Sequence, residues 1–529
     1  MNTHKRQQAM RSRERHVPLA LAPAPTPAPA PFGTAAASAL AAQGVVTAPV
    51  CVPGPGQRCE HALVDQSLNA LLHDYDQQMR GRFESIEDVL RTLSGFQHER
   101  DFSARAQALS RQRLGFELPA DWLDNAWSGG LCMASLHAHA MFKTVERCVQ
   151  STAGDRAPWL QRLPVQASTL AYLGLHTVDI TPCADGRLQG LVPFILRTAP
   201  CDSVSVKSYA GALFDIETDV ADWTHRELLR LAGAWGDIGQ GYLKVAVYHF
   251  SSSAPGHQGC AAHGSQDGVA VKAAIDRLHG LCAAIDYTYG QGAAPHVVLI
   301  GVDTDLDALR VHLSDAAGQL QAQRFIDGAS LYQTTLGLGA KDARRSVADA
   351  VASHLHDLGH APQAPAMRGL AQLAAIWLEA NFSQMEYVVA HHQGRYAVIG
   401  HDEQFVCAGD TLPQLQLRNQ FYYAHLDTVE EGSADLDVAL QIFNGLNIRR
   451  GLGMPILVHF TYVEQVPGSQ QRALERGVRV AHAIEQRFAA LQQSRQLFCR
   501  VAVSDRESGR WELLGNDAGS GAGNAPAAH

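Results

Sequence analysis

From about residue 159 onward, short runs rich in Val, Ile and Leu alternate with helical stretches, and this alternation most constrains the fold. The predicted strands are Tyr172–Ile180, Leu191–Leu196, Leu243–Phe250 and Val297–Asp303, and the predicted helices are Asp222–Trp235, Gly268–Tyr287 and Lys341–His354. Such alternation is typical of an α/β domain with a largely parallel sheet buried by helices. Functional groups in these sheets often lie at strand ends.

The region before this domain has a helical pattern. Large apolar residues recur at three- and four-residue steps from Leu68 to Leu93, and another helix is expected over Ala134–Val149. Residues 56–158 therefore predict a small all-helical domain. Residues 1–55 are basic at their start and rich in Pro and Ala, and they predict a disordered tail. Residues 515–529 predict a second, flexible tail of Gly, Ala and Asn.

Length and charge narrow the class of protein. A chain of 529 residues is too long for one core, so two to four domains are expected. The net charge of −9 argues against a general nucleic-acid binder. No apolar run reaches the ~20 residues that a membrane span needs, and no secretory signal is evident.

The ten cysteines form no tight framework of pairs, which predicts a cytoplasmic and largely reduced chain. In an oxidising compartment, Cys51 could pair with Cys59, and Cys132 with Cys148.

Three residues have the types and positions of metal ligands. Cys183 follows the first predicted strand, His249 lies at the end of another, and Cys260 comes shortly after. Two thiolates and one imidazole give Zn²⁺ three ligands and leave a fourth position open, which is typical of catalytic sites. In an extended segment, Asp185 and Arg187 would share a face with Cys183.

The order Cys-x-Asp-x-Arg, then His, then Cys resembles the β-class carbonic anhydrases, although ten residues separate His249 from Cys260. The stretch from His249 to Gly264 is similar to the carboxysomal shell carbonic anhydrases, a divergent β-like subclass. The resemblance covers residues from about 55 to about 515. It implies an α/β fold with a β-carbonic-anhydrase-like catalytic domain. It also implies one Zn²⁺ per chain and reversible hydration of carbon dioxide, which would supply carbon dioxide from bicarbonate to Rubisco.

The resemblance also implies roles for single residues. Asp185 would orient the zinc-bound water as a hydrogen-bond acceptor, and Arg187 would keep Asp185 ionised. His257 and His263 flank Cys260 and are candidates for a proton shuttle, although each is more often a surface or capping residue.

The resemblance places the protein in the bacterial cytoplasm, on the inner face of the carboxysome shell, as a homodimer or larger homo-oligomer. The basic N-terminal tail would bind Rubisco or shell proteins. A transit peptide or a plain solvated tail explains the same composition.

The region after the catalytic domain resembles a worn copy of it. Gln393-Gly394-Arg395 matches Asp185-Gly186-Arg187, Ala424–Asp427 matches Ala212–Asp215, and Ile456–Phe460 matches Ala246–Phe250. In this comparison Cys183 corresponds to His391, Cys260 to Gln470 or Arg472, and only His459 is kept among the ligands. We therefore expect a catalytic domain at 159–365 and a degenerate duplicated copy at 366–514, acting as a pseudo-twofold partner.

Two other classes of function stay open. One is a non-catalytic carboxysome interaction protein with a structural zinc, and the other is a zinc hydrolase of small amides or esters. Three further motifs are rejected as metal sites: the calcium-like loop at Asp303, the histidines of His354–His360, and the pair His391-His392.

Overall fold

We describe the fold from a computed structural model of the chain. It describes residues 61–152, 158–235, 241–361, 365–396, 400–426 and 433–514. The predicted tails at 1–55 and 515–529 lie outside these residues, as do Cys51 and Cys59. No helix in the described ranges is long and apolar enough to cross a membrane.

The first described region is helical, as predicted. Its helices are α2 (Gln66–Phe96), α3 (Phe102–Arg113), α4 (Ala120–Asp124), α5 (Ala126–Gly129) and α6 (Met133–Thr152), followed by the 3₁₀ helix η1 (Pro158–Arg162). The long helix α2 buries one face, which includes Leu72, Phe83 and Leu90. Asp65 caps its first turn by accepting a hydrogen bond from the Leu68 N–H.

The pairing of Cys132 with Cys148, which the sequence left open for an oxidising compartment, does not fit the structure, because α6 separates the two residues. Cys132 immediately precedes α6, and Cys148 lies near its end. Sixteen residues of helix span about 24 Å, whereas disulfide-linked Cα atoms lie within about 7 Å of each other.

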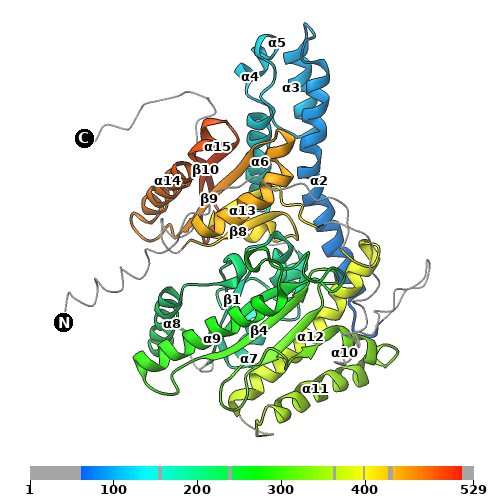
Figure 1. The fold of residues 1–529 in the computed structure, drawn as a ribbon, viewed down its shortest axis with the longest axis vertical. Helices are drawn as coiled ribbons and strands as arrows, with labels where there is room; N and C mark the ends of the chain where they lie inside the picture. Colours follow the sequence, from blue (N-terminus) through cyan, green and yellow to red (C-terminus); the bar gives the residue numbers. More distant parts are fainter. Residues whose placement is uncertain are drawn as a thin grey trace, which may run out of the picture. The chain divides into compact units, whose positions relative to one another are not determined.

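The first sheet has six strands in the order β2-β1-β3-β4-β5-β6. Its strands β1 and β4 are labelled in Figure 1. The parallel strands are β1 (Leu175–Pro182), β2 (Val204–Val206), β3 (Gly241–Phe250) and β4 (His296–Asp303). Strand β5 (Leu309–Leu313) runs antiparallel to β4, and β6 (Ile326–Asp327) runs antiparallel to β5. Its helices are α7 (Ala167–Tyr172), α8 (Ile216–Leu231), α9 (Asp267–Tyr289), α10 (Gly328–Thr335), α11 (Ala340–Asp357) and α12 (Pro365–His391).

The predicted strand over Leu191–Leu196 is wrong. Leu191–Ile195 forms the π-helix η3, every residue of which is buried. A run of buried apolar residues suits a buried strand and a buried helical turn equally, so periodicity cannot separate them. Three 3₁₀ turns also lie near strand ends: η2 (Gly186–Leu188), η4 (Ala210–Ala212) and η5 (Ala261–His263).

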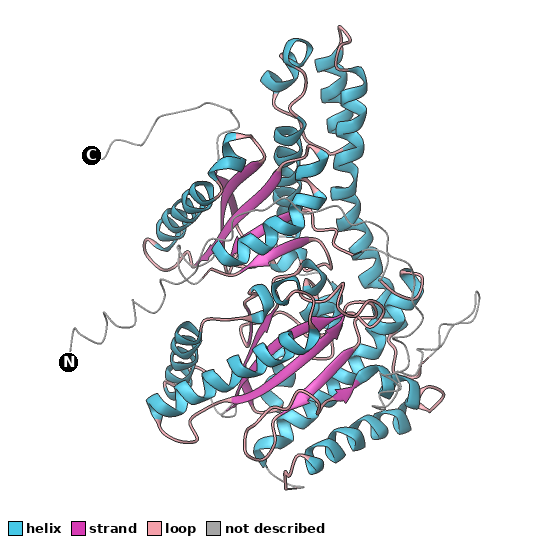
Figure 2. Ribbon diagram, in the orientation of Figure 1, coloured by secondary structure: helices cyan, strands magenta, loops and turns pink. Residues whose placement is uncertain are grey.

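The second sheet has five strands in the order β11-β10-β9-β7-β8. It is the upper group of magenta strands in Figure 2. The strands are β7 (Phe405–Gly409), β8 (Phe421–Ala424), β9 (Met454–Tyr462), β10 (Leu497–Asp505) and β11 (Trp511–Leu514). Its helices are α13 (Ser433–Leu446), α14 (Ser469–Arg487) and α15 (Ala489–Gln493), with the 3₁₀ turns η6 (Pro413–Leu415) and η7 (Ile448–Arg450). Only β11 runs antiparallel to its neighbour.

Two cores stabilise the second sheet. Phe405, Cys407 and Phe421 belong to a cluster that also contains the buried residues of α2 and α6. The alternate residues Val406 and Ala408 belong to a cluster with α13 and α14. Because successive residues of a strand point to opposite faces, the helical region covers one face of this sheet and α13 and α14 cover the other.

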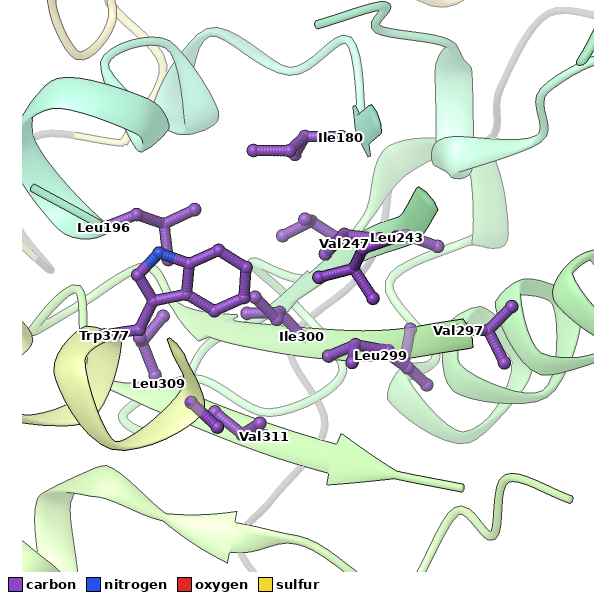
Figure 3. Packing of buried hydrophobic residues seen from close by; sticks show 14 of the residues in the cluster. Ile180, Leu196, Leu243, Val247, Val297, Leu299, Ile300, Leu309, Val311 and Trp377 are labelled. Atoms are coloured by element: carbon purple, nitrogen blue, oxygen red, sulfur yellow. The ribbon is translucent and has the colours of Figure 1, made fainter. Parts of the chain in front are cut away.

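The first sheet has its own core, part of which Figure 3 shows, including Ile180, Val247 and Ile300. Trp377 and Phe382 of α12 belong to this core. The predicted domain boundary at 365/366 stays a prediction, but α12, which lies beyond it, buries apolar residues with the first sheet.

Candidate metal centre

The three predicted metal ligands lie together at the carboxyl ends of neighbouring strands. Cys183 directly follows β1, His249 is the penultimate residue of β3, and Cys260 precedes η5. All three are buried, and their candidate ligand atoms lie within 4.8 Å of one another. The two sulfur atoms are 3.6 Å apart. β1 and β3 are adjacent in the sheet, which brings together residues that are 66 positions apart in sequence.

The ring nitrogens of His249 have no hydrogen-bond partner among the described residues. His249 is 0% exposed, and neither ring nitrogen makes a conventional hydrogen bond to a described residue. Its Nε2 lies 3.5 Å from Asp185 Oδ2. A buried imidazole whose ring nitrogens make no hydrogen bond to the described residues, beside two thiols, is a donor set suited to a tetrahedral Zn²⁺.

The two thiols have different environments. The hydrogen bond with Cys260 and burial raise the pKa of Cys183 well above its usual value. The same bond with Cys183 lowers the pKa of Cys260 despite its burial. The backbone N–H of Gly211 donates to Cys183 Sγ at 3.3 Å, which stabilises a thiolate at that position.

A glycine at 211 fits both its conformation and its neighbours. Its φ is 67°, in the left-handed region that favours glycine. A Cβ at this position would also collide with the ring of His263. The predicted shuttle residue His263 therefore packs against the backbone that supports Cys183, and its Nε2 lies 3.2 Å from the Gly211 oxygen.

The other predicted shuttle residue, His257, is exposed. Its backbone N–H donates a hydrogen bond to the Ala254 oxygen, and its backbone oxygen accepts one from the Ser265 hydroxyl.

Asp185 and Arg187 form a buried bidentate ion pair beside the ligands. Arg187 Nε donates to Asp185 Oδ1 at 2.9 Å, and Nη2 donates to Oδ2 at 2.8 Å. The guanidinium also donates to the carbonyl oxygens of Gln258, at 2.7 Å, and Gly259, at 3.2 Å. The pair is therefore bonded directly to the segment that carries Cys260.

The ion pair keeps Asp185 ionised. Burial opposes ionisation, but the Arg187 charge outweighs it and holds the pKa of Asp185 well below its usual value. The Asp185 charge in turn raises the pKa of Arg187, although burial opposes this. The carboxylate is thus a fixed acceptor.

Sequence reasoning missed two residues of this site, His401 and Glu403. His401 Nε2 lies 4.0 Å from Asp185 Oδ2, and its Nδ1 lies 2.9 Å from Glu403 Oε1. The same Glu403 oxygen accepts the Gly186 N–H at 3.1 Å. A Cβ on Gly186 would collide with Glu403, so glycine permits this close approach.

The pKa of His401 depends on the two carboxylates beside it. Burial opposes its protonation, but the charges of Asp185 and Glu403 raise its pKa. Its side chain is 29% exposed, whereas that of Asp185 is 4% exposed. His401 therefore connects the buried carboxylate to a more exposed position. No periodicity or local motif marks residues 401–403, which lie about 140 positions after Cys260.

The rejected motifs do not form metal sites in the described residues. Only two groups there meet the metal-site geometry: Cys183, His249 and Cys260, and the group of Asp185, His401 and Glu403. Asp305 Oδ2 instead accepts bonds from Ser251, at 3.0 Å, and from the Ser253 N–H, at 2.7 Å, and so holds the segment after β3. Burial raises the pKa of Asp303 to about 6.

Comparison with known proteins gives consistent matches over most of the chain. The family model described as carboxysome shell carbonic anhydrase, catalytic domain, matches residues 166–401. The models for the C-terminal and N-terminal parts of the same proteins match residues 402–516 and 61–153.

Curated relatives agree with these matches, and three are named carboxysome shell carbonic anhydrase. The protein of Halothiobacillus neapolitanus is 37% identical over 470 residues, which cover 87% of this chain and 91% of the relative. That of Prochlorococcus marinus (strain MIT 9313) is 38% identical over 454 residues, covering 84% and 87%. That of Hydrogenovibrio crunogenus is 34% identical over 446 residues, covering 82% of each.

Proposed function

The chain belongs to the carboxysome shell carbonic anhydrase family, and we propose that it catalyses the zinc-dependent, reversible hydration of carbon dioxide inside the carboxysome. There it would supply carbon dioxide from bicarbonate to Rubisco. The observation that carries the proposal is the buried Cys183–His249–Cys260 group beside the ionised Asp185–Arg187 pair.

Cys183, His249 and Cys260 would hold the ion and leave one position free. Bound Zn²⁺ supplies a water that ionises near neutral pH and so provides hydroxide. The protein supplies a dry, fixed environment around that position. Because His249 and both thiols are buried, bulk water does not compete with the ligands.

Asp185 acts as the orienting acceptor. Its Oδ2 lies 3.5 Å from His249 Nε2, and it is fixed by Arg187 rather than free to rotate. An ionised carboxylate only accepts hydrogen bonds, so it directs a neighbouring hydroxyl proton toward itself and the oxygen lone pair away. Arg187 is a positioning residue in this scheme, since it acts through Asp185.

The proton leaves through His401, which we place ahead of His257 and His263 for this role. His401 is closer to solvent than Asp185 and faces the same carboxylate oxygen. Glu403 fixes its Nδ1, so Nε2 is the atom that exchanges the proton. His263 is the weaker candidate because its Nε2 lies against the Gly211 oxygen.

The second sheet acts as a scaffold for the catalytic loop. The backbone N–H of Tyr423 donates to the Ala184 oxygen at 3.1 Å, and that of Asn419 donates to the Gly186 oxygen at 2.7 Å. These bonds hold the residues on either side of Asp185. We infer that the second sheet is a degenerate duplicate of the first, which packs where a second catalytic subunit would lie.

The N-terminal tail is proposed to bind Rubisco or shell proteins at the inner face of the shell. Its arginines at positions 6, 11, 13 and 15 suit an acidic partner surface. Such contacts are screened beyond about 10 Å at ~0.1 M salt. Deleting residues 1–55 should leave solution activity intact and abolish salt-sensitive capture by Rubisco or shell protein. Equal capture with and without the tail at every salt concentration would refute this role.

The decisive experiment is zinc analysis together with stopped-flow carbon dioxide hydration on the purified full chain. We expect one zinc per chain, hydration activity, and loss of both on chelation. Bound zinc without hydration activity would favour the structural-zinc interaction protein. Hydrolysis of small esters or amides without carbon dioxide hydration would favour the zinc hydrolase.

A further inference from the structure

Arg197 is a buried arginine that lies after η3 and contacts both α2 and α12. It follows the π-helix η3 and is 1% exposed. Its φ is 48°, a left-handed conformation that is unfavourable for a residue with a Cβ. The surrounding structure must therefore stabilise this conformation.

The guanidinium of Arg197 has too few acceptors. Nη2 donates to Asn69 Oδ1 of α2 at 2.7 Å and to Gln384 Oε1 of α12 at 3.1 Å. Nε and Nη1 have no hydrogen-bond partner among the described residues. Both acceptors are neutral amides, and no described carboxylate lies within ion-pair distance of Arg197. Burial accordingly lowers the pKa of Arg197 to about 10.

The nearby carboxylate of Asp307 is already occupied. Its Oδ1 accepts from Arg418 at 3.2 Å, and its Oδ2 accepts from Gln384 at 2.9 Å. Asp307 therefore satisfies other donors, and the charge of Arg197 lacks a direct partner. A buried charge without compensation is costly, so a counter-charge is expected.

Two further buried donors lie beside η3 without partners. The Tyr387 hydroxyl and the Trp159 indole N–H make no hydrogen bond within the described part of the chain. Both rings pack against Phe194 of η3, at centroid distances of 6.2 Å and 6.1 Å. Tyr387 also lies three residues after Gln384 on α12, so the two side chains share one helix face.

We propose that Arg197 and Tyr387 bind one small monovalent anion, of the size of chloride or bicarbonate, with Trp159 as a further donor. The unsatisfied groups are one cation and neutral donors, which complements a single negative charge. A doubly charged anion would leave a buried excess charge. Enclosed water is the rival occupant, since it also accepts hydrogen bonds.

This anion would connect α2, η3 and α12. Asn69 and Gln384 bind the same guanidinium nitrogen from two helices, and η3 follows the catalytic loop by only a few residues. Leu196 and Trp377, which flank this region in the first core, appear together in Figure 3. Binding to the folded state alone would raise the melting temperature as the anion concentration rises.

The test is the melting temperature of the zinc-loaded full chain at constant ionic strength. Sodium chloride or sodium bicarbonate replaces sodium gluconate, whose anion is too large for an enclosed site. We expect a rise of several degrees with at least one of the two ions, and their relative effects identify the preferred one. Tyr387→Phe and Arg197→Gln should abolish the rise.

The matched control is Tyr332→Phe, which removes a buried hydroxyl that already donates to Glu386 at 3.0 Å. It should lower the melting temperature and keep the anion-dependent rise. If Arg197→Gln does not fold, the anion-dependent rise in melting temperature is compared between Tyr387→Phe and Tyr332→Phe.

Crystals grown in sodium bromide provide a direct readout. An anomalous peak between Arg197 and Tyr387 is expected. Two results would each overturn the proposal: no anion dependence in the wild type, or an unchanged dependence in Tyr387→Phe with no bromide peak at this place.

Discussion

The two sheets have the same plan and different chemistry. In the first sheet, the parallel strands β1 and β2 lie on one side of β3, and the parallel strand β4 and then the antiparallel strand β5 lie on the other. In the second sheet, β7 and β8 lie on one side of β9 in the same way, and the parallel strand β10 and then the antiparallel strand β11 lie on the other. Both β3 and β9 carry a histidine, His249 and His459 respectively. The two sheets share this strand order although, among the described residues, the Cys-His-Cys group lies at the first sheet alone, because apolar side chains are enough to keep the core of a sheet.

The register identifies which residues correspond. Pro182 pairs with Val247, so two residues further on Ala184 lies opposite His249, and Gly409 pairs with His459 in the second sheet. By this register Ala408 takes the place of Cys183, and Asp410 takes the place of Asp185. The predicted correspondence of Cys183 with His391 is therefore wrong, since His391 ends α12, before the second sheet begins.

The corresponding aspartates bind different groups. Asp185 binds Arg187 beside the metal ligands, whereas Asp410 Oδ2 accepts bonds from the Thr461 N–H at 2.8 Å and from its hydroxyl at 2.7 Å. His459 Nε2 lies 2.8 Å from Ser504 Oγ, so this histidine is satisfied where His249 is not. Buried polar groups need hydrogen-bond partners, and His459 has them within the protein.

The largest expected difference between the sheets is in metal binding. Cys183→Ala should remove the zinc and all carbon dioxide hydration, because only two ligands remain. Cys407→Ala is the matched control, a buried cysteine in the second sheet that should keep both. Metal analysis and stopped-flow hydration decide the outcome, and a second zinc per chain would break the comparison.

The next difference concerns the two aspartates. Asp185→Asn should retain zinc and lose hydration activity by about 10²-fold or more, since an amide also donates and no longer fixes the orientation. Arg187→Ala should act in the same direction through the loss of that pairing. Asp410→Asn should lower the melting temperature and leave kcat unchanged, and equal losses of kcat in both sheets would contradict the assignment.

A smaller effect on hydration activity is expected from replacing His401, the residue proposed to pass the proton to solvent. His401→Ala should lower kcat about tenfold or more while kcat/KM falls less, because proton transfer follows the chemical step. Imidazole buffer should restore part of the rate. His257→Ala serves as the control, and a larger effect there than at His401 would reverse the assignment.

The smallest effect on metal content is expected from placing a cysteine in the second sheet at the position that matches Cys183. Ala408→Cys should leave the zinc content at one per chain, because the positions matched to Cys260, which are Gln470 and Arg472, carry no thiol. Ala408 is fully buried, so the larger side chain should cost about 1–3 kcal/mol of stability. A gain of metal measured by the same analysis would mean that the second sheet keeps more of a site than its contacts indicate.

Much of the fold was predictable from local patterns. The apolar face of α2 and the runs of β1, β3 and β4 follow from periodicity and length. The π-helix at Leu191–Ile195 was not predictable, because its side chains are apolar in every direction. The packing of the N-terminal helices on the second sheet was also hidden, since an apolar helix face does not specify its partner.

The residue types of the candidate metal centre could be read from the sequence alone, because Cys183, Asp185 and Arg187 are close neighbours and the family motif continues through Cys260. Tertiary structure alone decided that His401 and Glu403 join them. A hydrogen bond such as that from Gly186 N–H to Glu403 links positions 217 residues apart. Only folding brings groups so far apart in sequence into contact, and the residues next to each of them do not indicate that contact.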